Sequence, residues 1–309
     1  MLKIDAFAHV LLPRFYHKML KIDPNIPKDL PFINNEVLTD MKKRKEASIS
    51  GVKQIISYVN VNPEDYTDPE NSYILCKEAN EELIQTIKDN SEIFYGGVAM
   101  IPMNNLEGTI DIIKNQVIPN KELVGIQIFT RALGKSIADS KYLKVFECAN
   151  KYNLTIFLHP VFDNRKPDNN IVFSWEYELS QAMMQIVNAD IYQKYPDLKI
   201  IVHHAGAMIP FFAGRIKYIL GNDKETYFKK FYVDTAILGN TKALELAASY
   251  FGIDHLLFGT DAPLGIMPAG ATKEIISAIN NMNISEEEKE DILTNNIIKL
   301  IEKGKKEND

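Results

Sequence analysis

The sequence predicts an α/β protein, a single (β/α)8 TIM barrel over residues 1–309. Three observations support this prediction: eight short apolar runs, helical segments between most of them, and a length of 309 residues. Runs such as Ile156–Leu158 and Ile200–Val202 are continuously apolar, which is typical of parallel strands buried on both faces. Eight strand–helix units in this length match a closed barrel, and a doubly wound open sheet is the alternative.

The expected strands recur along the whole chain: Leu2–Phe7, Val52–Tyr58, Phe94–Met100, Val124–Phe129, Leu154–His159, Lys199–His204, Phe231–Thr235 and His255–Thr260. Parallel neighbours need long crossovers, and helical spacing provides them in Asn71–Asp89, Lys141–Lys151, Glu178–Lys194, Met208–Leu220 and Thr241–Tyr250. After the last strand, Ser285–Glu288 has the capping-box pattern that opens a final helix.

Two stretches, residues 11–40 and 160–174, fit no strand–helix unit. The first carries four prolines and the second is mostly polar. Long connections in compact domains are often functional. We therefore expect both insertions to be lids over the C-terminal ends of the strands.

Composition excludes several classes of partner. The net charge of −6 argues against a nucleic-acid-binding face and against a polybasic membrane anchor. No apolar run approaches the roughly 18 residues of a membrane span, and the first residues lack a signal-peptide pattern. Cys76 and Cys148 are expected to be buried free thiols. We expect a cytoplasmic protein without a nucleic-acid or membrane partner.

Histidines and aspartates gather at the expected C-terminal ends of five strands, where TIM barrels place catalytic groups. These residues are His9, His159, His203, His204, Asp234 and Asp261. Each has a structural interpretation alone, since an aspartate after a strand is often a helix cap. Together they predict one site, and imidazoles with carboxylates suit a divalent metal such as Zn²⁺.

Several neighbouring residues leave two interpretations open. Arg131 follows the fourth strand and could bind an anion or pair with a loop. Trp175 could form an apolar substrate wall or belong to the core. His203 is expected to support the site rather than bind metal. Lys42–Arg44 is expected to be a solvated helix face.

Five segments carry a resemblance to a known family: Asp5–His9, Phe157–Pro160, His204–Pro210, Gly214–Arg215 and Gly259–Asp261. In order and spacing they resemble the amidohydrolase-related family, in the branch of aminocarboxymuconate-semialdehyde decarboxylase and the aromatic acid decarboxylases. The resemblance implies that His9, His159 and Asp261 are metal ligands. It also implies that His204 stands beside the metal-bound water as the general acid/base, so that His204 and Asp261 are the expected catalytic residues.

The same resemblance implies a homodimer, because Arg215 matches an arginine that reaches a substrate carboxylate in the neighbouring subunit. Glu178 matches an acidic position with a structural role. One departure is important: the first ligand position is Phe7, and phenylalanine cannot coordinate a metal. Three protein ligands plus water can still form a catalytic zinc site. Phe7 would then contact an uncharged part of the substrate.

The sequence therefore predicts a metal-dependent, non-oxidative decarboxylase of a small unsaturated or aromatic carboxylic acid, with Zn²⁺ as the expected metal. Two alternatives stay open. One is a metal-dependent hydrolase of an ester, lactone or amide, since one fold hosts many reactions. The other is a metal-free descendant that binds a small acid, which Phe7 favours.

Overall fold

The computed structural model describes residues 2–161 and 170–302 and confirms the expected barrel. Its strands, in spatial order, are β1 (Lys3–Val10), β2 (Val52–Tyr58), β3 (Phe94–Ala99), β4 (Leu123–Phe129), β7 (Thr155–His159), β8 (Lys199–Val202), β9 (Tyr232–Asp234) and β10 (Leu256–Leu257). Neighbours in this order pair in parallel. Backbone hydrogen bonds close the ring, from Ala6 N to Phe258 O and from His9 N to Ala262 O, both 2.7 Å. The doubly wound alternative is therefore wrong.

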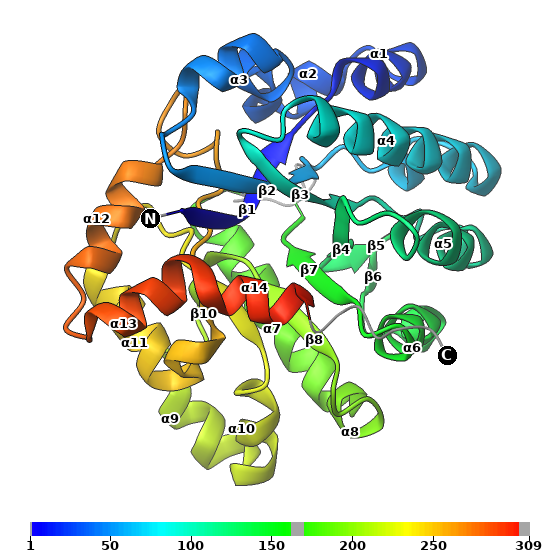
Figure 1. Cartoon of the computed structure of the whole chain (residues 1–309). Helices are drawn as coiled ribbons and strands as arrows, with labels where there is room; N and C mark the ends of the chain where they lie inside the picture. Colours follow the sequence, from blue (N-terminus) through cyan, green and yellow to red (C-terminus); the bar gives the residue numbers. More distant parts are fainter. Residues whose placement is uncertain (1, 162–169, 303–309) are drawn as a thin grey trace.

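Helices surround the ring of strands (Figure 1). The longer ones are α4 (Pro69–Asp89), α5 (Leu106–Ile112), α6 (Leu143–Lys151), α7 (Ser174–Asn188), α10 (Asn222–Phe228), α11 (Thr241–Phe251) and α12 (Thr272–Asn280). The others are α3 (Met41–Ala47), α8 (Ile191–Lys194), α9 (Ala213–Arg215) and α13 (Glu286–Glu290). Helix α13 opens with the expected capping box at Ser285. Arg131–Ala132 (β5) and Lys135–Ser136 (β6) form a small antiparallel hairpin.

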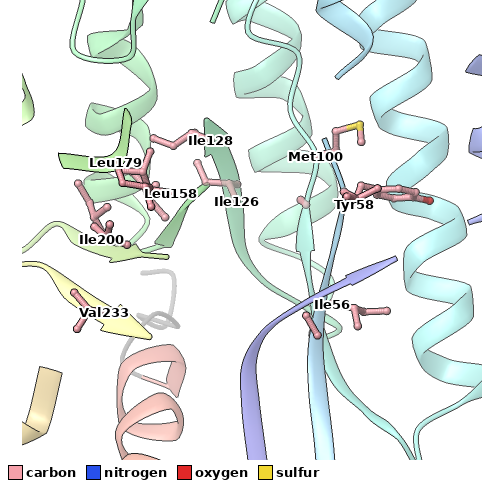
Figure 2. Close-up of a cluster of buried hydrophobic side chains, with 14 of the residues drawn as sticks. Ile56, Tyr58, Met100, Ile126, Ile128, Leu158, Leu179, Ile200 and Val233 are labelled. Carbon is pink, nitrogen blue, oxygen red and sulfur yellow. The ribbon is translucent and has the colours of Figure 1, made fainter. Parts of the chain in front are cut away.

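Alternating strand residues build two cores, because successive side chains point to opposite faces. Outward residues such as Ile126, Ile128 and Leu158 belong to one buried cluster with Leu179 of α7 (Figure 2). Inward residues, including Phe7, Phe157 and Ile201, fill the barrel. Helix α14 (Asn296–Glu302) lies across the ring in Figure 1, and its Ile297 and Leu300 join the inner core.

Several expected strands are shorter in the structure, the sixth and the eighth most clearly for the site, whereas the first extends to Val10. The sixth ends at Val202 rather than His204, and the eighth spans only Leu256–Leu257. His204, Ala205 and Gly206 all have positive φ, between 55° and 73°, so the chain leaves the sheet in a tight turn. A Cβ on Gly206 would lie 2.6 Å from the Phe251 ring, so only glycine fits there.

The insertion at 11–40 is helical, with α1 (Pro13–Ile22), α2 (Ile26–Asp29) and two short 3-10 helices. Asn35 donates hydrogen bonds to the carbonyls of Pro263 and Pro268, and Phe32 meets Trp175 edge-on. The insertion thus lies at the C-terminal end of the barrel, and its action as a lid stays a prediction. Of the second expected lid, residues 162–169 lie outside the described residues.

Candidate metal centre

Four buried side chains meet at the C-terminal end of the barrel: His9 from β1, His159 from β7, His203 after β8 and Asp261 after β10. One potential ligand atom of each lies within 4.8 Å of the others. Three of these, His9, His159 and Asp261, are the ligands that the family resemblance implies. His203 is an addition, since we expected it to support the site only. The four residues form a candidate site for a divalent metal.

Strand alternation explains why these side chains converge. Phe157 points into the barrel, and His159, two residues later, points the same way. Ile201 points inward on β8, and His203 continues that face beyond the strand end. Alternation along β8 was therefore the signal that could have identified His203 from the sequence.

The nitrogens of His9 and His159 suit metal binding. His159 Nδ1 donates to the Pro160 carbonyl at 2.8 Å, and its buried Nε2 has no hydrogen-bond partner among the described residues. His9 Nδ1 lies 3.0 Å from Ser57 Oγ, and its Nε2 lies 3.0 Å from Asp261 Oδ1. Burial lowers the pKa of both imidazoles, and the neutral form is the one that coordinates metals. The buried Nε2 of His159, which has no hydrogen-bond partner among the described residues, therefore fits the role of a metal ligand.

His203 lies between two carboxylates. Its Nδ1 bonds to Asp234 Oδ2, and its Nε2 lies 3.3 Å from Asp261 Oδ1. Burial opposes a charge on His203, yet these carboxylates raise its pKa to about 10. Burial likewise opposes ionisation of Asp261, but hydrogen bonds from His203 and His9 hold its pKa well below the usual range. Without metal, His203 and Asp261 therefore stabilise each other's charged forms.

A buried polar network fixes the joint between β1 and the segment after β10. Asp5 accepts hydrogen bonds from Thr260 Oγ1 at 2.6 Å and from Gln54 Nε2 at 3.0 Å. Arg44 donates to the His9 carbonyl at 2.8 Å and to Gln54 Oε1. Our expectation that Arg44 is solvated is wrong, since it is only 3% exposed. The sequence of α3 alone could not predict that Arg44 lies against the buried carbonyls of His9 and Ala262, because these lie on distant segments.

His204 lies beside the four residues but outside the candidate metal group. Its ring centroid is 4.1 Å from that of His203, and it stacks on Trp175 at 6.0 Å. Its Nδ1 lies 2.8 Å from Glu176 Oε1, an acidic partner that the sequence analysis missed. Glu176 and Trp175 both come from the first turn of α7, so the mouth of the site is built by this helix.

The remaining expected site residues lie at three distinct places. Phe7 is buried inside the barrel, with its ring stacked on His203 at 4.2 Å. Arg131 pairs with Glu178 of α7 at 2.9 Å. Arg215 ends α9 and is exposed. None of these three contributes to the four-residue group.

Comparison with known families identifies the chain. The amidohydrolase family model matches residues 56–302. The chain belongs to the amidohydrolase family. Amidohydrolase membership confirms the family resemblance drawn from the strand-end motifs.

Curated relatives of this amidohydrolase include decarboxylases. The chain is 26% identical over 267 residues to 2-amino-3-carboxymuconate-6-semialdehyde decarboxylase of Dictyostelium discoideum, covering 80% of this chain and 72% of the relative. It is 24% identical over 291 residues to 6-methylsalicylic acid decarboxylase of Penicillium expansum, covering 85% of each.

Solved structures share the fold. The 5-carboxyvanillate decarboxylase of Novosphingobium aromaticivorans, complexed with manganese and 4-hydroxy-3-methoxy-5-nitrobenzoic acid, matches with a TM-score of 0.84 at 17% identity. The match covers 97% of this chain and 96% of that one.

Within the described residues, no helix has the length and hydropathy needed to cross a membrane.

Proposed function

We propose that this amidohydrolase is a metal-dependent, non-oxidative decarboxylase of a small unsaturated or aromatic carboxylic acid. The observation that carries the proposal is the buried group of three imidazoles and one carboxylate, in which His159 Nε2 has no hydrogen-bond partner among the described residues. Relatives named as decarboxylases support the same reaction class.

His9, His159 and Asp261 would hold the ion, and Zn²⁺ is the metal we propose for this nitrogen-rich set. A bound divalent metal supplies Lewis acidity that polarises a substrate oxygen. Asp261 also contacts His9 and His203, so its charge orients both rings. Manganese in a structural neighbour makes Mn²⁺ the second ion to test.

His204 would move the proton. In a non-oxidative decarboxylation the bond between the ring or alkene carbon and the carboxyl carbon breaks, and its electron pair stays on the former. That carbon then takes a proton, and CO₂ leaves. His204 lies at the edge of the metal group with its Nδ1 beside Glu176, and we assign the proton transfer to its other ring nitrogen, Nε2.

Three further residues would contact the substrate. Arg131 lies where the fourth strand ends, and its guanidinium is held by Glu178, so we propose that it faces the substrate's charged group. Phe7 would provide an apolar floor beside the metal. Trp175, whose ring lies 5.9 Å from His159 and 6.0 Å from His204, would form a wall for an unsaturated substrate.

We propose a homodimer in which Arg215 reaches the partner's site. Apolar side chains flank Arg215 in the chain and are strongly exposed: Phe211 (75%), Tyr218 (83%) and Ile219 (64%). A large exposed apolar patch usually marks an interface. Sedimentation should give a dimer, and Tyr218→Glu should dissociate it. A monomeric wild type would contradict the dimer.

Two buried free cysteines fit a reducing compartment, and we propose the cytoplasm.

The function is tested by measuring CO₂ release from a panel of aromatic and dienoic acids. The protein should be stripped with a chelator and reloaded with Zn²⁺ or Mn²⁺. Metal-dependent CO₂ release from at least one acid supports the proposal. Ester, lactone or amide hydrolysis without CO₂ release would instead favour the hydrolase. Binding of acids by a protein that takes up no metal would favour a metal-free binder.

A further inference from the structure

A buried arginine outside the metal centre has no carboxylate partner. Arg44 of α3 forms no ion pair with any of the described residues. Its hydrogen bonds go to the carbonyls of His9 and Ala262 and to Gln54 Oε1, and they use four of its five N–H donors. Asp5 acts on this charge only from beyond the Gln54 amide. Since buried charges are normally paired, this guanidinium points to an anionic partner from outside the chain.

Arg44 lines a narrow cavity between α3 and α12, which are neighbours around the ring (Figure 1). None of the described residues in the cavity wall is acidic. The free volume is about 20 Å³, which has room for one group about the size of a water molecule. Phosphate and sulfate are too large for this space. The cavity is therefore suited to a single small ion.

The N-terminus of α12 reaches the same cavity through Thr272, its first residue. Ala271, at the N-cap, provides no side-chain acceptor for the first backbone amides, and these amides favour a negative group. The Thr272 side chain is only 5% exposed, and its hydroxyl makes no hydrogen bond with the described residues. Glu274, the acidic residue of this turn, does not line the cavity. A second, independent donor therefore lies across the cavity from Arg44.

A wider cavity of about 390 Å³ adjoins the narrow one and shares Ile49 and Val52 with it. Its described lining includes Lys3 and Lys273 and no acidic residue. Neither lysine forms an ion pair with the described residues. In a chain with a net charge of −6, a positive approach of this kind raises the local concentration of anions.

We propose that the narrow cavity between α3 and α12 binds a small monovalent anion, chloride, between the Arg44 guanidinium and the N-terminus of α12. The remaining Arg44 N–H and Thr272 Oγ1 would donate to the ion. The same guanidinium donates to the carbonyls of His9 and Ala262, so the bound anion would hold Arg44 against the backbone of the metal centre. The site lies outside the metal centre and does not rest on the proposed function.

The test is the dependence of thermal unfolding on chloride, measured on the full chain at constant ionic strength with gluconate as the replacement anion. Metal-loaded and chelator-stripped protein are compared, because a halide can also bind a metal ion. The unfolding midpoint should rise with chloride and with bromide in both forms, as expected for a ligand that binds only the folded state. Acetate should not replace chloride, because it is too large for the cavity.

Thr272→Val keeps the shape of the side chain and removes its hydroxyl. It should weaken chloride binding by about 2–10-fold, the usual effect of one hydrogen bond. Thr241→Val is the matched control, because Thr241 is the first residue of α11 and its hydroxyl donates to the Ala278 carbonyl instead. Its chloride dependence should equal that of the wild type.

Unfolding that does not depend on chloride would overturn the proposal. A response confined to the metal-loaded protein would place the halide on the metal, and an unchanged response in Thr272→Val would place it elsewhere on the chain. Equal stabilisation by acetate would make this a carboxylate site and contradict the assignment to chloride. Anomalous scattering from bromide in crystals should give a peak between Arg44 and Thr272.

Discussion

The floor and the mouth of the site are built in different ways. The floor consists of strand ends, and its polar side chains are buried and fixed by hydrogen bonds, as Asp234 holds His203 and Asp5 holds Thr260. The mouth consists of the first turn of α7 and the 11–40 insertion; Glu176 of α7 is partly exposed, and Phe173, the residue before α7, is 73% exposed. The floor is suited to fixing an ion, whereas the mouth can change without disturbing it.

This difference predicts that floor substitutions change metal binding and mouth substitutions change turnover. Asp261→Ala should have the largest effect, because it removes a ligand and the partner of two imidazoles. We expect metal affinity to fall by more than about 100-fold, beyond the usual cost of losing a supporting contact. Activity should fall to background. Near-normal metal content in this variant would mean that the floor does not hold the metal.

His204→Ala tests the mouth side of the comparison. A general acid/base contributes typically about 10²–10⁴-fold, so turnover should fall by that order. Metal content should stay unchanged, because His204 lies outside the four-residue group. Metal analysis and turnover on the same preparation decide the result. Loss of the metal would make His204 part of the floor.

The sequence could predict the floor better than the mouth. Strand runs and strand-end residues are local signals, so the eight strands and His9, His159 and Asp261 could be placed before the structure was known. The place of His203 in the four-residue group was missed because the two adjacent histidines were assigned opposite faces with His204 toward the site, whereas the inward face of Ile201 continues to His203. Glu176 and Arg44 could not be found, because their partners lie on segments distant in the chain.

Arg44→Met tests whether the floor depends on its support. The change leaves buried acceptors on His9 and Gln54 without a donor, each costing about 1–3 kcal/mol of unfolding free energy. Denaturant unfolding should show the loss, and metal affinity should weaken with it. Lys42→Met, on the exposed side of the same helix, is the control. Unchanged stability would show that the joint holds without Arg44.

The smallest expected effect is on the pH dependence of stability, and it comes from Glu64, which belongs to neither the floor nor the mouth of the site. Burial raises the pKa of its carboxyl from 4.5 to about 8, so the folded protein keeps the proton after the unfolded chain has released it. Stability should therefore fall as pH rises between these values, by at most about 1.4 kcal/mol per pH unit. Glu64→Gln should flatten this part of the profile, and the exposed Glu81→Gln should not. Identical slopes in wild type and Glu64→Gln would contradict the assignment.

The most direct test of the central claim is the fate of the carboxyl group in heavy water. The metal-loaded protein is incubated in D₂O with an acid that it consumes, and the product is analysed by mass spectrometry. Metal-dependent decarboxylation predicts equal amounts of CO₂ and product, with one deuterium on the carbon that lost the carboxyl group. Substrate consumption that releases no CO₂ and leaves the carbon skeleton without deuterium would contradict the account.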